Sequence, residues 1–193
     1  MPTVKHRHRP GIAWTLLVAL LWLIVALLWL TACQSEHADQ PPPEAVTPDR
    51  EAMTYYGRMI LVDHRGPKAQ IHLESRDAPL WFSQVRDAVA FTLSPEEPND
   101  IAAIHVTDMA RADGWDQPQT WMPAEEAVYV IDSERRGGMG ALETVPFSER
   151  VAAEAFAAEH GGELMSWDEI TEDYIFERSI KAVESPRMMQ HDH

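Results

Sequence analysis

Three methionines and one histidine in this sequence stand at positions where a metal ion could reach them. Met59 and His64 lie in one short stretch; Met109 follows an aspartate, and Met139 lies among glycines. Thioether sulfur and imidazole nitrogen suit the soft ion Cu(I), whereas Zn(II) favours thiolate, nitrogen and oxygen donors. A single thioether is a poor ligand set, so we expect these side chains to share one site. The candidate Cu(I) ligands are therefore Met59, His64, Met109 and Met139.

Each candidate also has a structural explanation. Methionine commonly fills irregular gaps in cores, although Met139 lies in a Gly-Gly-Met-Gly run that predicts a turn with little to pack against. His64, beside a Gly-Pro pair, is by itself also typical of a solvated turn residue. His72 and His105 alternate into predicted strands, so we interpret them as residues on a sheet face.

Motifs for catalysis are missing from the sequence. The glycine-rich run around Met139 lacks the Gly-Lys-Ser/Thr ending of a phosphate loop. The sequence contains no Gly-x-Ser-x-Gly elbow and no Cys–His pair for nucleophilic catalysis. The neighbouring acids Glu96-Glu97 and Glu125-Glu126 would point apart on regular elements. The sequence therefore favours binding over catalysis, and we expect the protein not to be an enzyme.

The amino-terminal segment has the pattern of a lipoprotein leader. Lys5, Arg7 and Arg9 precede residues 11–31, which carry no charge, and Leu-Thr-Ala-Cys follows and ends at Cys33. This pattern predicts export, cleavage before Cys33 and acylation of that cysteine. The alternative is an uncleaved membrane anchor, since about 20 apolar residues can span a bilayer. Either way, we expect the domain to lie outside the cytoplasm. In the lipoprotein interpretation it is lipid-anchored to a bacterial membrane and faces the periplasm.

Lipidation would use the only cysteine in the chain, leaving neither a disulfide nor a free thiolate. Without the three basic residues of the leader, 13 basic residues remain against 31 acidic ones, a formal net charge of −18. This charge argues against nucleic acid as a partner and is compatible with metal cations or a positively charged protein.

Two segments of the chain resemble each other. Residues 82–91 align with 147–156 at a constant offset of 65, with Phe, Ser, Ala, Ala and Phe in common. Each segment predicts a helix, with Ser83 or Ser148 as its N-cap. Pro95 and Pro98 should end the first helix, and His160-Gly161-Gly162 the second. The strands predicted around the helices are 59–62, 69–73 and 101–106, then 127–131, 140–145 and 163–167.

Each half therefore reads strand–strand–helix–strand, and the sequence predicts an α+β fold of two similar ββαβ units. A small sheet with one helix leaves an apolar face open, so the units should pack together. The expected organisation is a signal peptide (1–32), a proline-rich tether (33–51), two units (52–110 and 111–180) and a disordered tail (181–193). The tail carries further soft ligands at Met188, Met189, His191 and His193, and we expect it to be dispensable.

Several motifs, in order, resemble the accessory proteins of nitrous oxide reductase, the NosL family. The matching residues are Tyr56 and Met59, His64 with Gly66-Pro67-Lys68, Trp81-Phe82-Ser83, Thr107-Asp108-Met109 and Arg136-Gly137-Gly138-Met139-Gly140. The resemblance implies a duplicated ββαβ fold, Cu(I) binding, and copper delivery to nitrous oxide reductase alongside its ABC-type maturation machinery.

The sequence departs from this family at one position. Members usually read Tyr-Cys-Gly-Met, and Gly57 stands where that cysteine would be. Because a thiolate is a strong Cu(I) ligand, its loss leaves a second interpretation open: a metal-free scaffold lipoprotein that docks on the reductase or its transporter.

Overall fold

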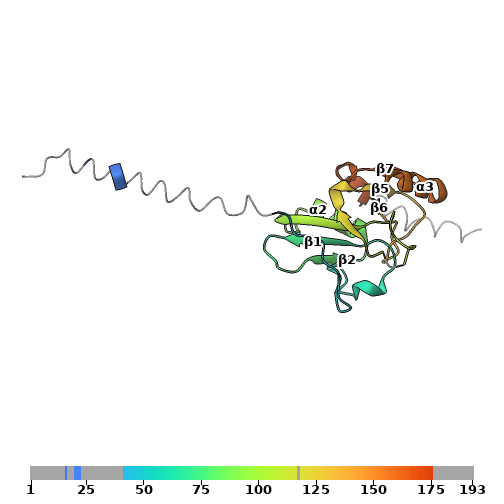
Figure 1. Ribbon diagram of the computed structural model, residues 1–193, viewed down its shortest axis with the longest axis horizontal. Coiled ribbons are helices and arrows are strands. Elements are labelled where there is room, and N and C mark those ends of the chain that lie inside the picture. The colour runs from blue at the N-terminus through green and yellow to red at the C-terminus, as the bar shows by residue number, and fades with distance from the viewer. Residues whose placement is uncertain (1–15, 17–19, 23–40, 117, 176–193) are drawn as a thin grey trace, which may run out of the picture. The chain divides into compact units, whose positions relative to one another are not determined.

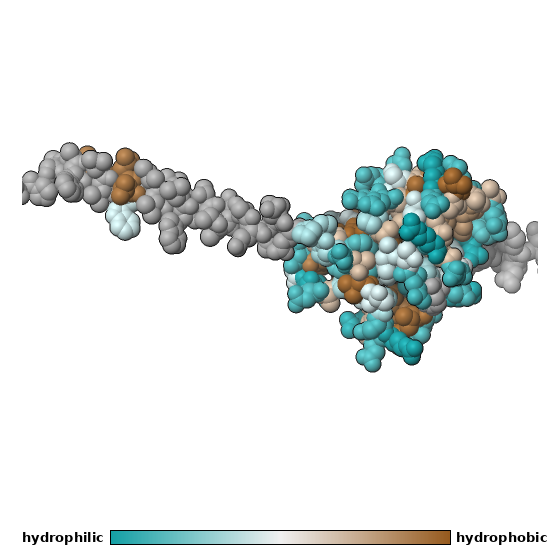
Figure 2. All heavy atoms as spheres, viewed as in Figure 1, coloured by the Kyte–Doolittle hydropathy of each residue, from teal (hydrophilic) through white to brown (hydrophobic). Residues whose placement is uncertain are grey.

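The computed structural model describes residues 16, 20–22, 41–116 and 118–175, and the folded domain begins at Pro42 (Figure 1). The predicted lipidation residue Cys33 and the predicted tail lie outside the described residues. In the described part of the chain, no helix is both long and apolar enough to cross a membrane. The visible face of the domain is mainly hydrophilic, with hydrophobic residues reaching it in separate patches (Figure 2).

The first unit is a four-stranded antiparallel sheet with one helix. Its elements are β1 (Ala69–Leu73), β2 (Leu80–Phe82), α2 (Val85–Leu93), β3 (Ile101–Thr107) and β4 (Trp121–Pro123). The strands lie in the order β2-β1-β3-β4. Alternate residues such as Ile71, Phe82 and Val106 are buried together with Val85 and Phe91 of the helix. This burial of one sheet face against α2 forms the larger core of the domain.

The second unit has the same order of elements. It consists of β5 (Val128–Ile131), β6 (Val145–Phe147), α3 (Arg150–His160) and β7 (Glu163–Met165), with strand order β6-β5-β7. Phe82 pairs with Ala69 in the first sheet, and Phe147 pairs with Val128 in the second, so the aligned phenylalanines occupy equivalent register positions. The predicted α+β class is confirmed, and the topology is consistent with the predicted repeat.

The two faces of the small second sheet bury different partners. Val130 lies in a cluster with Val145, Phe147 and Ala153 under α3. Tyr129 and Ile131, which point the other way, belong to the larger core of the first unit. The two units lie beside each other (Figure 1), and the open face of the second sheet packs against the core of the first unit.

The predicted strand over 59–62 is wrong. Ile60 makes only an isolated bridge to Met53, and Leu61–Asp63 form a 3-10 turn. Leu61 is fully buried and its backbone N–H donates to the carbonyl of Ala52, which bends the chain inward. The strand that pairs with β1 is β2 instead. The predicted strand over 140–145 is also misplaced, because β6 begins only at its last residue.

The predicted serine N-caps are wrong as well. Neither helix has a capping hydrogen bond from the side chain of its N-cap residue, which is Gln84 for α2 and Glu149 for α3. The backbone N–H of Arg86 in the first turn of α2 donates to the carboxylate of Glu143. The hydroxyl of Ser148 donates to Asp108 instead of capping α3. In α2 a distant carboxylate thus replaces the local capping that the sequence suggested, and before α3 the predicted cap residue is bound to Asp108 instead.

Other expected helix boundaries agree with the structure. α2 ends at Leu93, just before Pro95, and α3 ends at His160 with Gly161 as its C-cap at φ 72°. This positive φ is one that glycine adopts without steric cost. The predicted proline-rich tether is partly joined to the domain, because the backbone N–H and carbonyl of Val46 are both hydrogen-bonded to the side chain of Gln70.

Candidate metal site

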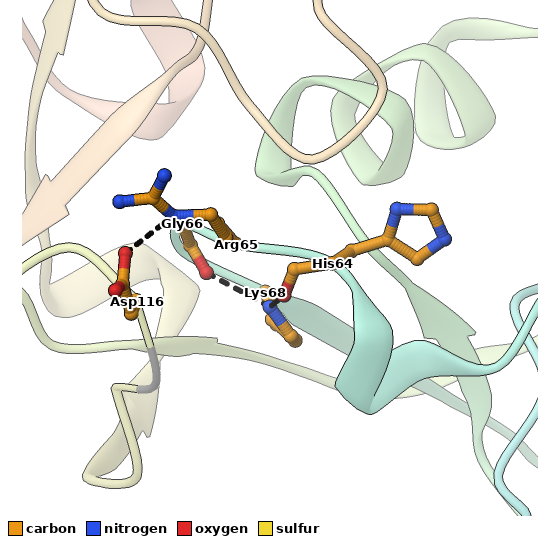
Figure 3. Close-up of polar contacts among 5 residues, drawn as sticks. All are labelled: His64, Arg65, Gly66, Lys68 and Asp116. Carbon is orange, nitrogen blue, oxygen red and sulfur yellow. Dashed lines mark hydrogen bonds and ion pairs between the residues drawn. The ribbon is translucent and has the colours of Figure 1, made fainter.

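The loop that carries His64 is held by a buried lysine. The ammonium group of Lys68 donates to the carbonyl oxygens of His64 at 2.6 Å and Gly66 at 3.0 Å (Figure 3). Burial lowers the pKa of Lys68 to about 8, while the nearby Glu143 carboxyl acts in the opposite direction. The imidazole of His64 points away from this anchor (Figure 3). Lys68 therefore fixes the loop backbone and leaves the ring available.

A second anchor closes the other side of the same loop. The backbone N–H of Gly66 donates to the carbonyl of Trp115 at 2.8 Å. A Cβ at Gly66 would lie 3.2 Å from the indole ring of Trp115, and φ there is +90°. Arg65 and Asp116 form an ion pair at 2.5 Å (Figure 3), but both side chains are exposed, so it adds little stability.

The glycine run around Met139 forms the predicted turn and lies against His64. Arg136 and Leu142 form an isolated antiparallel bridge, and Met139 between them is 47% exposed. A Cβ at Gly138 would come within 2.7 Å of the His64 Cβ, so only glycine fits there without rearrangement. Residues 74 positions apart in the chain are thereby brought into contact.

This contact also selects the tautomer of the imidazole. Nδ1 of His64 lies 3.1 Å from the carbonyl oxygen of Gly138. A carbonyl can only accept, so Nδ1 carries the proton and donates to it. In the neutral form of the ring this leaves the lone pair on Nε2, the nitrogen available to a metal. Backbone carbonyls commonly fix metal-binding histidines in this way.

Two buried side chains support the turn: Gln84, from the start of α2, bonds to it directly, and Glu143, just after the turn, ties it to α2. The carbonyl oxygen of the Gln84 side chain accepts from the backbone N–H of Met139 at 3.0 Å. Glu143 accepts from the backbone N–H groups of Arg86 and Thr144, and its other carboxyl oxygen has no partner. That oxygen lies 2.0 Å from where a Cβ at Gly137 would stand. Burial raises the pKa of Glu143 to about 8, despite the lowering effect of the two backbone hydrogen bonds.

A surface hollow of about 600 Å³ opens beside His64. The walls come from the two loops already described and from the segment that carries Trp115. The lining residues are Asp63, His64, Arg65, Trp115, Glu134, Arg135, Arg136, Gly137 and Gly138. The guanidinium of Arg135 lies over the Trp115 ring, 4.2 Å from its centroid. The hollow gives a ligand or a partner protein access to the His64 ring, and its rim is rich in arginine.

Met59 lies in a tight loop that is organised by a threonine. The backbone N–H of Thr54 donates to the Met59 carbonyl, and the Met59 N–H donates to the Thr54 hydroxyl. Gly57 and Arg58 both have positive φ, at 76° and 50°. A Cβ at Gly57 would lie 3.2 Å from the Met59 methyl group, so the thioether arm occupies the space beside the missing side chain.

Met109 has a different environment. Its backbone N–H donates to the Pro146 carbonyl, and its side chain packs on the apolar cluster under α3 together with Trp115 and Phe156. The neighbouring Asp108 is buried and accepts from the backbone N–H and the hydroxyl of Ser148. These are the surroundings of a methionine that packs between the two units.

The structure therefore brings the His64 ring and the turn of Met139 together. It places Met59 over Gly57 in the preceding loop and Met109 against the second cluster. The supporting residues Gln84 and Glu143 were missed by the sequence analysis. No sequence pattern marked either one, because each acts on a turn more than fifty residues away.

The chain is similar to proteins of one family. A family model described as NosL matches residues 45–175. The copper-binding lipoprotein NosL of Achromobacter cycloclastes is 43% identical over 188 residues, 96% of this chain and 93% of that protein. The protein of the same name from Stutzerimonas stutzeri is 31% identical over 172 residues, 88% and 85% of the two chains. The crystal structure of the copper chaperone NosL from Shewanella denitrificans is similar with a TM-score of 0.65 and 30% identity, covering 68% of this chain and 98% of that chain.

The raised pKa of Glu143 predicts a pH-dependent stability. Between its ordinary pKa of 4.5 and its folded value of about 8, the folded state holds a proton that the unfolded state has lost. Stability should therefore fall as pH rises through this interval, by on the order of a few kcal/mol. Glu143→Gln should remove most of this decline in denaturant unfolding measured between pH 5 and pH 8.

Glu149→Gln, at an exposed position before α3, is the matched control and should leave the decline unchanged. Lys68 has a folded pKa of about 8 against an ordinary value of 10.5, so its titration raises the stability with pH, but only above pH 8. A Glu143→Gln variant that loses stability as steeply as the unaltered protein would contradict this assignment.

Proposed function

This chain belongs to the NosL family, and on that premise we propose that it is a membrane-anchored copper chaperone that binds Cu(I) through methionine and histidine side chains. In this proposal it is anchored through Cys33 and faces the periplasm. It acts as a carrier of copper and catalyses no reaction. The observation that carries the proposal is the contact between the His64 ring and the glycine turn of Met139.

The chemistry of this contact supports Cu(I) as the ion. His64 offers Nε2, and the exposed Met139 offers a thioether one residue beyond the carbonyl that orients the ring. Imidazole together with thioether is a soft donor set that suits Cu(I) better than Zn(II). Met59 is the third donor of the proposed set, and its flexible arm extends over Gly57. Met109 is the fourth, although its packing gives it a second role in the core.

Replacing Met139 tests the ligand set. Met139→Ile removes the sulfur while roughly conserving volume. We expect Cu(I) affinity to fall about tenfold or more, the scale of loss seen when even supporting residues of metal sites are replaced. The measurement is an anaerobic titration of the purified chain against a Cu(I) chelator. Met53→Ile is the matched control, because Met53 is 46% exposed and Met139 47% exposed.

The same Cu(I) titration is carried out on the Met59→Ile and Met109→Ile variants. Each is expected to weaken binding, and the loss for Met109→Ile should come with a loss of thermal stability because its side chain packs under α3. Unchanged Cu(I) affinity after replacement of Met59, Met109 and Met139 together would overturn this site. A chain that binds no Cu(I) before any substitution would favour the metal-free scaffold.

Restoring a cysteine at position 57 provides the converse test. A thiolate beside the Met59 methyl group would add a strong Cu(I) ligand. Gly57→Cys should therefore tighten Cu(I) binding. It should also destabilise the fold by about 1–2 kcal/mol, because φ is +76° there. Gly57→Ser carries the same strain without the thiol and serves as the control. Equal Cu(I) affinity in the two variants would argue against a site at this loop.

The proposed destination of the copper is nitrous oxide reductase, with its ABC-type maturation machinery as a further partner. This part rests on the motifs that the chain has in common with its family. The arginine-rich hollow beside His64 offers a place where an acidic surface could dock during transfer. The deciding measurement is transfer of Cu(I) from the loaded chain to copper-free reductase. Transfer no faster than from a small-molecule Cu(I) complex would refute delivery.

A further inference from the structure

The outer face of the four-stranded sheet carries two buried histidines that the proposed function leaves without a role. Gln70 pairs with His105 across β1 and β3, so their side chains share a face, and His72 lies two residues along the same face. This face is opposite to the one that packs on α2. The sequence prediction that both histidines lie on a sheet face agrees with this register.

The two rings form a close pair. Their centroids are 5.5 Å apart at an interplanar angle of 81°. His72 is 6% exposed and His105 9% exposed. Nε2 of His72 lies 3.0 Å from the side-chain oxygen of Gln70, whereas Nδ1 of His105 is buried without any hydrogen-bond partner. An unpartnered buried ring nitrogen is costly unless something binds there.

Both rings are in the charge state that a metal requires. Burial lowers the pKa of His105, and burial with the neighbouring His105 lowers the pKa of His72. Neutral imidazole keeps a lone pair for a metal, whereas the protonated ring has none. Since Nε2 of His72 donates to Gln70, its lone pair is on Nδ1.

The amino-terminal segment and an acidic hollow border this pair. Val46 is hydrogen-bonded through both backbone groups to Gln70, the residue that also holds His72. His105 lines a hollow of about 500 Å³ whose wall includes Pro42. The carboxylates that line the same hollow are Glu125, Glu126 and Asp168. Cations are thereby attracted to the side of the sheet where the free nitrogen lies.

We propose that His72 and His105 form a second metal site, which takes a soft monovalent cation, Cu(I) or Ag(I), between two imidazoles. A bond from a metal to an imidazole nitrogen is about 2.0–2.1 Å long in zinc sites, so one ion can hold two ring nitrogens up to about 4 Å apart. Rings whose centroids lie 5.5 Å apart can present nitrogens at that spacing. Four-coordinate zinc would need more ligands, and within the described ranges no three His, Cys, Asp or Glu side chains are grouped to hold a metal. The second site uses none of the residues of the thioether site.

The test uses the full chain in detergent, with isotope-labelled histidine and Ag(I) as a redox-silent probe. Ring-nitrogen signals are assigned through single His→Gln variants and followed during the titration. We expect the nitrogens of His72 and His105 to shift on binding, and to shift equally in a Met59→Ile, Met139→Ile double variant. An equal shift in the double variant would show that the second site binds the ion without the thioether site of the proposed function.

His160→Gln is the control, since this histidine lies on α3 against Phe156. It should leave the response of the pair unchanged, whereas His105→Gln should abolish the response of His72. Shifts confined to His64 or to the tail histidines would overturn the second site while leaving the thioether site standing. The shifts are read in the unaltered chain, and if a variant at His72 or His105 fails to fold, the signals of the pair are those left after the other seven of the nine histidines are assigned.

Discussion

The close approach of two loops, 63–66 and 137–140, is the constraint on which the candidate site depends. Gly138 lies where a Cβ would meet both the His64 side chain and the backbone carbonyl of Ser83, at 2.7 and 3.0 Å. This approach lets one carbonyl orient the imidazole and sets Met139 at an exposed tip. A larger residue at this contact would separate the ring from the turn, so the site requires glycine as firmly as it requires its ligands.

Buried polar groups hold that geometry from below. Lys68 binds two carbonyls of the histidine loop, and Glu143 accepts from the N–H of Arg86 at the start of α2 and from the N–H of its neighbour Thr144. Burial disfavours the charged form of each, as their shifted pKa values show. Their hydrogen bonds also fix loops that have little apolar surface of their own. A site carried on loops needs buried partners to hold it in place, and here Lys68, Gln84 and Glu143 compensate for the lack of a core at the tip.

The sequence predicts those features that depend on local pattern. The two helices, the strands β1 and β3 and the turn at Met139 all follow from apolar periodicity and glycine placement. The prediction of a strand over 59–62 is wrong because its apolar residues do not pair in a sheet: Leu61 is buried in the core from a 3-10 turn. The support given by Gln84 and Glu143 had no local pattern either. Contacts across more than fifty residues are decided by how the units pack, which periodicity does not describe.

The two hollows differ in charge, and this contrast bears on how a carrier could load and release copper. The hollow beside His105 is lined by three carboxylates, while the hollow beside His64 is lined by three arginines, at 65, 135 and 136, together with the carboxylates of Asp63 and Glu134. In the proposed site, thioether and neutral imidazole donors bring no charge to offset a bound cation, so guanidinium groups that outnumber the carboxylates nearby would weaken its retention. Within about 8 Å, the screening length at physiological salt, the carboxylates beside His105 would attract the ion more strongly than the mixed charges beside His64. In the proposed function, the net charge of −18 expected after leader cleavage would concentrate cations broadly, and the arginines beside His64 would face an acidic partner during transfer.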